Sequence, residues 1–134
     1  MILETPSFGW PRYSLRTLLA LVTAVCVCAW AFQWRRSIAD ADYQWQAALA
    51  GWASEYSTIE DLNSASIKLR EAEDRIPFNS RAAGTAHLAR IQRLELRSRE
   101  VLPHLMPAGS DLGKQTLERF SKCRAEAEAW LAEQ

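Results

Sequence analysis

The sequence lacks the features that mark most enzymes and most proteins that bind polyelectrolytes. Its 16 basic and 16 acidic side chains cancel, and residues 35–134 alone hold 14 basic and 15 acidic ones. This balance argues against nucleic acid as the main partner. The chain has no glycine-rich phosphate loop, no nucleophile elbow and no HExxH motif around its two histidines. We therefore expect a protein that is not an enzyme, with no catalytic residues and no cofactor.

Cysteine, glycine and proline are also scarce. The three cysteines have no CxxC spacing, so the sequence predicts no metal site. Cys26 and Cys28 are interpreted as small apolar residues, and Cys123 stands alone near the C-terminus. Glycine and proline are few, with five of each, and Pro77, Pro103, Pro107 and Gly109 mark joints between segments. No stretch alternates apolar and polar residues convincingly. The sequence thus predicts an all-α fold.

An uncharged run from Thr17 to Trp34 is the clearest positive feature. As a helix it would measure roughly 27 Å, close to the ~30 Å hydrocarbon core of a bilayer. Tryptophan, tyrosine and arginine gather at both ends of the run, as they do at membrane interfaces. The sequence predicts an N-terminal tail at 1–14, a transmembrane helix at 15–34 and a helical domain at 35–134. The predicted interface residues are Trp10, Arg12, Tyr13, Arg16, Trp30, Trp34, Arg35 and Arg36.

Two other interpretations of the run stay open. It could be the buried core helix of a soluble protein, or a signal peptide cleaved near Ala29-Trp30-Ala31. Orientation is poorly marked, because Arg12 and Arg16 on one side balance Arg35 and Arg36 on the other. An uncleaved signal-anchor with a short tail favours a cytoplasmic N-terminus.

Helix-capping and helix-breaking residues divide the rest of the chain into helices. The approximate predicted ranges are 35–56, 58–76, 80–102 and 111–133. Ser57-Thr58-Ile59-Glu60 is a candidate capping box for the second helix, Asn79 or Ser80 can cap the third, and the fourth starts near Ser110. The sequence therefore predicts one transmembrane helix that continues into a small helical hairpin or bundle.

One stripe of large side chains is the candidate core. Five residues recur at steps of four and three, as in an a/d seam: Trp45, Leu49, Trp52, Tyr56 and Ile59. A second copy in a parallel dimer could cover this stripe. At about two heptads it is short for a coiled coil, which favours cover by the later helices of the same chain. The expected covers are Ile91, Leu94 and Val101 on one helix, and Leu117, Phe120 and Leu131 on the next.

A basic stripe is the candidate contact surface. Arg90, Arg93 and Arg97 recur at helical spacing and could meet a protein partner or anionic lipid. An ordinary solvated face is the alternative, because Glu95 and Glu100 interrupt the stripe. No aromatic residue interleaves to stack bases, which disfavours nucleic acid.

The segment Arg12-Tyr13-Ser14-Leu15-Arg16-Thr17-Leu18-Leu19, followed by an aliphatic span, carries a resemblance. It resembles the R-[FY]-S-L-R-T-L-L signal-anchor of many uncharacterised planctomycete membrane proteins. The resemblance covers roughly residues 10–34 and implies a single-pass protein of a bacterial inner membrane, without implying an activity. The segment is faintly similar to the start of type IV pilins, but Arg12 and Thr17 stand where pilins have glycine and glutamate.

The functional expectation is a membrane-anchored interaction or scaffold protein. Its partners would be the lipid bilayer and a protein, or further copies of the chain, bound through the helical tail. A pilin-like assembly subunit and an accessory subunit of a membrane enzyme are the alternatives.

Overall fold

The computed structural model describes residues 14–54, 57–107 and 109–134. Four helices are present in this part of the chain, and no strand is: α1 (Leu15–Ala53), α2 (Ile59–Asp74), α3 (Ser80–Leu105) and α4 (Asp111–Ala132). The predicted all-α fold is confirmed. The described residues fall into two units, one that ends at residue 33 and one that begins at residue 34, and α1 contributes to both.

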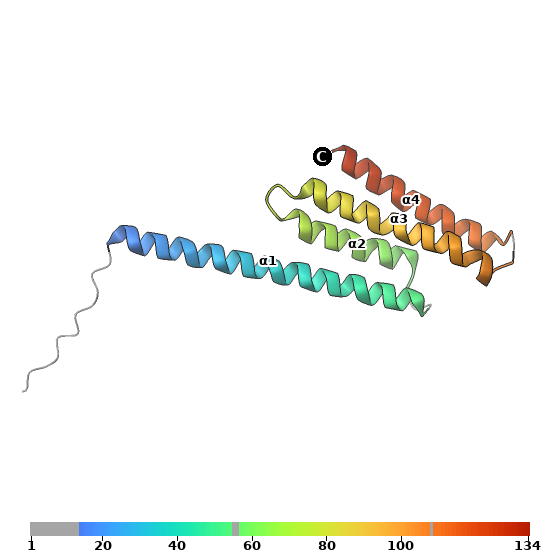
Figure 1. Cartoon of the computed structure of the whole chain (residues 1–134), viewed down its shortest axis with the longest axis horizontal. Helices are drawn as coiled ribbons and strands as arrows, with labels where there is room; N and C mark the ends of the chain where they lie inside the picture. The colour runs from blue at the N-terminus through green and yellow to red at the C-terminus, as the bar shows by residue number, and fades with distance from the viewer. Residues whose placement is uncertain (1–13, 55–56, 108) are drawn as a thin grey trace, which may run out of the picture. The chain divides into compact units, whose positions relative to one another are not determined.

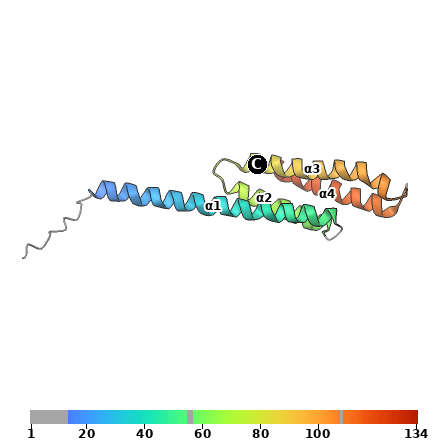
Figure 2. The same cartoon turned by 60° about the horizontal axis from the view of Figure 1, so that its bottom comes forward.

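The second unit is a bundle in which successive helices run antiparallel. The part of α1 from Trp34 onward lies beside α2, while α3 packs against both α2 and α4, as the two views in Figures 1 and 2 show. Two contacts fix one end of this bundle. The Trp34 indole Nε1 donates a hydrogen bond to the Ala72 carbonyl oxygen at 3.3 Å, and the start of α3 packs against Trp130 near the end of α4. The α2–α3 turn and the end of α4 therefore lie at the end where Trp34 enters.

The predicted seam of α1 lies in the hydrophobic core. Trp45 is buried, and Leu49 and Trp52 are partly buried against the same cluster. The prediction that Ile59 continues this stripe on the same helix is wrong, because α1 ends at Ala53 and the buried Ile59 is the first residue of α2. Trp52 meets the buried ring of Phe120 edge to face, with centroids 6.3 Å apart. Tyr56 lies outside the described residues. Cover therefore comes from α2 and α4 of the same chain.

The face of α3 is used differently from the prediction. Ile91 and Leu94 are buried, whereas Val101 is exposed. The buried face instead continues through His87 and Ser98, because the positions 87, 91, 94 and 98 repeat at helical spacing. Phe120 of α4 is buried, and Leu117 and Leu131 are half-buried. Of the residues expected to cover the seam, Ile91, Leu94 and Phe120 are thus buried, whereas the others are half-buried or exposed.

The helix ends show how local polar groups set the boundaries. Thr58 caps α2 by accepting a hydrogen bond from the Asp61 backbone N–H, while the Asp61 carboxylate accepts one from the Thr58 N–H. These hydrogen bonds, the backbone one first, lower the pKa of Asp61. The capping box is therefore Thr58–Asp61, one residue later than Ser57–Glu60, and the prediction of its register is wrong. The fourth helix starts near Ser110 as predicted, and the Ser110 side chain caps it by accepting a hydrogen bond from the Gly113 N–H.

Two other ends differ from the predicted ranges. α3 continues past Pro103 and ends at Leu105, three residues beyond the predicted end, because one proline removes only one hydrogen bond. Asn79 precedes α3, but its side chain makes no capping bond; its Nδ2 donates to the Glu73 carbonyl oxygen instead.

Gly84 marks a close approach between α3 and α4. A Cβ at this position would collide with the Trp130 ring and with Leu131, so no larger residue fits without movement. At an exposed helical site, glycine to alanine would stabilise by roughly 0.5–1 kcal/mol. At Gly84 we expect the same substitution to destabilise the bundle.

We predict that Gly84→Ala lowers the free energy of unfolding by about 1–3 kcal/mol, because the Trp130 ring must shift to admit the methyl group. Urea unfolding of the full chain in detergent micelles measures this change. The matched control is Thr85→Ala, at the neighbouring exposed position. Equal or greater stability of Gly84→Ala would contradict the packing of α3 on α4.

Candidate functional site

The N-terminal part of α1 is exposed along nearly its whole apolar run. It forms the one helix in the described residues that is long and apolar enough to cross a membrane, and none of that stretch is buried. Leu15, Leu19 and Phe32 are among the exposed large apolar side chains. A core helix of a soluble protein would be covered, so the exposure disfavours that alternative. A signal sequence has the same length and composition, and that alternative stays open.

The predicted interface residues fall in different surroundings. Trp10, Arg12 and Tyr13 lie outside the described residues. The others lie on α1, where Arg16, Trp30, Arg35 and Arg36 are exposed and Trp34 is half-buried. Because the Trp34 Nε1 donates to the Ala72 carbonyl oxygen, this residue ties α1 to α2. The sequence did not indicate this second role.

A polar cluster lies in the bundle between α2 and α3. Ser66 has 0% and His87 2% of its surface exposed, and the Ser66 Oγ lies 2.7 Å from the His87 Nδ1. The Arg90 Nε donates to the Ser66 Oγ at 3.1 Å, and the Arg90 Nη2 pairs with the Glu73 carboxylate at 3.3 Å. If the Ser66 hydroxyl donates to Nδ1, its proton is used inside the cluster. The result is a continuous line of polar contacts from α2 to α3.

The charge state of His87 follows from this environment. Burial lowers the pKa of His87 to about 4, and the cations Arg70 and Arg90 act in the same direction. The imidazole is therefore neutral at pH 7. A neutral imidazole can accept the Ser66 proton, whereas an imidazolium would place a third positive charge beside two guanidinium groups.

A second buried charge sits between α3 and α4. Glu95 has 3% of its surface exposed, and its two carboxylate oxygens pair with Arg99 at 2.7 Å and Arg124 at 2.9 Å. Both oxygens are thus satisfied, which offsets the cost of burying the charge. Nearby, the Arg70 guanidinium stacks 4.2 Å from the centre of the Trp130 ring and links α2 to α4.

The basic stripe predicted on α3 divides into two parts. Arg90 faces inward, where Ser66 and Glu73 occupy its guanidinium. Arg93 and Arg97 are exposed, and within the described residues neither takes part in an ion pair. Leu96 lies between them on the chain and is also exposed. Of the three predicted residues, these two arginines remain accessible to a partner.

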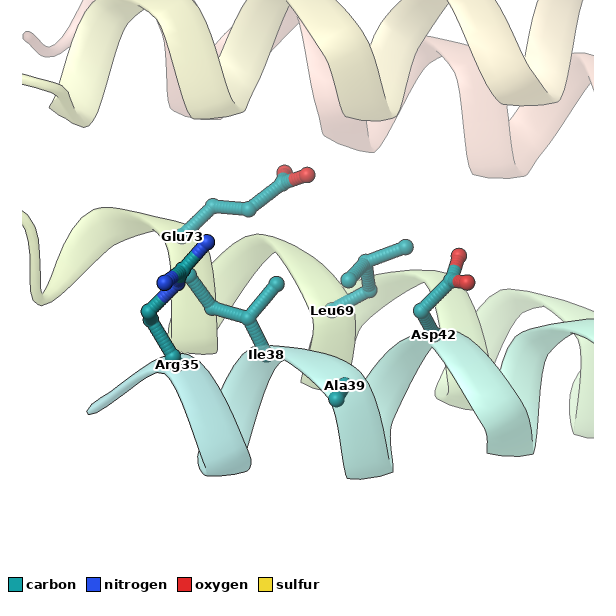
Figure 3. Close-up of a pocket in the computed structure, with 6 residues that line it drawn as sticks. All are labelled: Arg35, Ile38, Ala39, Asp42, Leu69 and Glu73. Atoms are coloured by element: carbon teal, nitrogen blue, oxygen red, sulfur yellow. The ribbon is translucent and has the colours of Figure 1, made fainter. Parts of the chain in front are cut away.

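A groove of about 350 Å³ opens between α1 and α2. Figure 3 shows its lining: Arg35, Ile38, Ala39 and Asp42 from α1, with Leu69 and Glu73 from α2. Glu73 extends away from α1 in this view, in keeping with its pairing to Arg90. The groove thus shares one carboxylate with the polar cluster.

The chemistry available at these sites is limited. A Ser–His contact is the minimal nucleophile–base pair, yet the Ser66 side chain is fully enclosed and its oxygen already accepts from Arg90. In the described part of the chain, no group of three His, Cys, Asp or Glu side chains could hold a metal ion. The cluster is best understood as a device that fixes the register of α2 against α3.

The cysteines lie apart from this cluster. Cys26 and Cys28 are exposed on the apolar part of α1, and Cys123 is half-buried against the core. Burial is the main reason that the pKa of the Cys123 thiol is raised, with Glu126 and Glu60 adding to it. A raised pKa disfavours the thiolate, so Cys123 behaves as an inert packing residue.

Sequence reasoning missed the buried polar residues. The sequence shows no motif around the two histidines and gives His87 no role, and the structure shows that His87 is buried. One available signal was its spacing, since it precedes Ile91 and Leu94 on the same helical stripe. Ser66 carried no comparable signal, because serine on a helix is ordinarily solvated.

We predict that acid destabilises the bundle through His87. The folded pKa of about 4 lies below the ordinary 6.5, so the stabilisation is fully present above pH 6.5 and is lost as the pH falls towards 4. The loss attributable to this residue should be roughly 2–3 kcal/mol. Urea unfolding of the full chain and of His87→Gln, across pH 4 to 7, measures it.

Glutamine keeps an acceptor for the Ser66 hydroxyl but does not titrate. The variant should therefore lose less stability than the native chain over the same pH interval. If the free energy of unfolding falls equally with pH in the two proteins, His87 does not titrate as its burial implies.

Comparisons with models of protein families, with curated proteins and with solved structures were made for the whole chain, and none of them finds a match.

Proposed function

We propose that the chain is a non-enzymatic, single-pass membrane protein whose helical bundle is an interaction domain. The observation that carries the proposal is that the two parts of α1 have different surroundings. Its N-terminal part exposes a stretch that is long and apolar enough to cross a bilayer, and its C-terminal part supplies Trp45 and Trp52 to the bundle core. One helix therefore joins an anchor to a folded domain without an intervening linker.

The anchor half of the proposal rests on solvation. Leaving the large apolar side chains of this run in water is costly, since each gains about 1.5–3 kcal/mol when buried. Lipid removes that cost for the run on α1. In a bacterial cell this would be the inner membrane, with the N-terminus in the cytoplasm.

The interaction half rests on the surface of α3. Arg93 and Arg97 are exposed and have no ion pair within the described residues, and an exposed leucine, Leu96, accompanies them. Arginine combined with an apolar side chain is a frequent composition of protein contact surfaces. We assign the partner contact to this face of α3. The partner would be a protein that presents acidic side chains to Arg93 and Arg97.

The test uses the full chain in native membranes with two measurements. Carbonate extraction should leave the native chain in the membrane fraction, whereas Val25→Arg, which costs about 2.5–3.5 kcal/mol of insertion, should reduce that fraction. Formaldehyde crosslinking should yield a complex that the double variant R93E/R97E loses.

The control is K114E/K122E, which makes the same change of charge at two exposed lysines of α4. It should retain the crosslinked complex. Release of the native chain by carbonate would refute the anchor. The same crosslinked complex for all three proteins would refute the assignment of the contact to α3.

A further inference from the structure

Phe78 combines two features that a folded chain normally avoids. Its φ is +63°, in the left-handed region, where a bulky side chain is an outlier. Its side chain is also fully exposed, so the aromatic ring buries nothing in the bundle. Strained backbone of this kind persists where the surrounding structure holds it in place, and it clusters at functional sites. Packing within the bundle therefore does not account for a phenylalanine at this position.

The turn that presents Phe78 is well fixed. The Asn79 N–H donates to the Ile76 carbonyl oxygen at 3.1 Å, which closes a four-residue turn with Pro77 and Phe78 at its centre. Proline holds φ near −65°, and a positive φ at the next residue then defines a type II turn, where glycine is the usual occupant. The Asn79 side chain also holds the turn, through its bond to the Glu73 carbonyl. Phe78 is thus held outward by the turn itself.

The position of this turn in the bundle indicates what the ring could meet. The α2–α3 turn lies at the end of the bundle where Trp34 enters and where α4 ends (Figure 1). Trp34 directly follows the last residue of the apolar unit. By chain connectivity, a bilayer that holds the apolar run begins within a residue or two of this end.

The charges at this end suit an anionic membrane surface. Four exposed arginines stand on or beside it, and none has an ion pair within the described residues: Arg35, Arg36, Arg75 and Arg81. Of the nearby acids, Glu73 is paired with Arg90 and Asp74 is half-buried, while Glu71 and Glu133 are exposed. Each basic residue near an anionic headgroup adds attraction, and an exposed phenylalanine suits the acyl boundary.

We propose that the α2–α3 turn is a second membrane contact, in which Phe78 inserts into the interface of the bilayer that holds the α1 anchor. The arginines of this end bind the anionic headgroups around it. The inference rests on the proposed membrane anchor. It accounts for a phenylalanine at a turn position that favours glycine, because the side chain serves the lipid surface.

The test places a nitroxide label at single cysteines in the full chain, after Cys26, Cys28 and Cys123 are changed to alanine. The label positions are Phe78→Cys, Val25→Cys in the anchor and Leu112→Cys, an exposed apolar position at the opposite end of the bundle. The protein is reconstituted in vesicles of phosphatidylcholine with phosphatidylglycerol. Accessibility to oxygen and to a water-soluble nickel chelate is then measured by electron paramagnetic resonance.

The expected result is loss of nickel accessibility at positions 78 and 25, with full accessibility at 112. In vesicles of phosphatidylcholine alone, position 78 should regain part of its accessibility, because the headgroup charge is absent. Position 78 as accessible as 112, with 25 shielded, overturns the inference and leaves the anchor standing. Accessibility at both 25 and 78 overturns the anchor as well.

Self-association and packing are tested by two further measurements. Shielding at position 78 that disappears as the protein is diluted in lipid would mean that a second copy covers Phe78, which contradicts the proposal. Phe78→Gly removes the strained side chain, so the bundle should melt at the same or a higher temperature. A lower melting temperature would reveal a packing role and overturn the inference.

Discussion

The structure depends on the burial of one face of α1. Trp45, Leu49 and Trp52 are large side chains on a helix whose preceding apolar stretch is exposed, and α2 and α4 cover them. A fully buried side chain of this size contributes roughly 1.5–3 kcal/mol. Trp45 contributes at this level, and the partly buried Leu49 and Trp52 contribute less, to a core that also contains the fully buried Leu62, Ile91 and Phe120. Because α1 carries both the apolar run and this face, forming the bundle fixes where the exposed run ends. The hydrogen bond from Trp34 to Ala72 marks that point.

The remaining contacts give the bundle specificity as well as stability. The buried core contains several alanines, and part of the interior is polar: Ser66, His87, Glu95 and Ser98. Pairs such as Ser66–His87 and Glu95–Arg124 tolerate little sliding of one helix along another, since a shift would leave a buried polar group unpaired. Gly84 against Trp130 adds a steric restraint of the same kind. A small core with such fixed contacts can hold four helices in one register.

Sequence reasoning predicted the features that depend on hydrophobic periodicity. The apolar run, the seam of α1 and the number of helices follow from patterns that are visible along the chain. Sequence reasoning failed for residues whose type suits both an exposed position and a buried contact. Trp34 was interpreted as a membrane belt residue, and Arg90 as part of an exposed stripe, yet both bond to groups more than twenty residues away. Partners that are distant in the chain leave no local pattern, so tertiary contacts decided these roles. The Phe78 turn was missed for another reason: proline indicated a break, but only the backbone conformation shows the positive φ.

The central claim is that the seam of α1 is covered by helices of its own chain. A double-mutant cycle of Trp52→Ala and Phe120→Ala, measured by urea unfolding of the full chain in detergent micelles, tests it most directly. The edge-to-face pair predicts a coupling energy of about 0.5–1.5 kcal/mol, unchanged when the protein is diluted. A coupling energy of zero, or one that vanishes on dilution, would show that the seam is covered otherwise and would contradict the account.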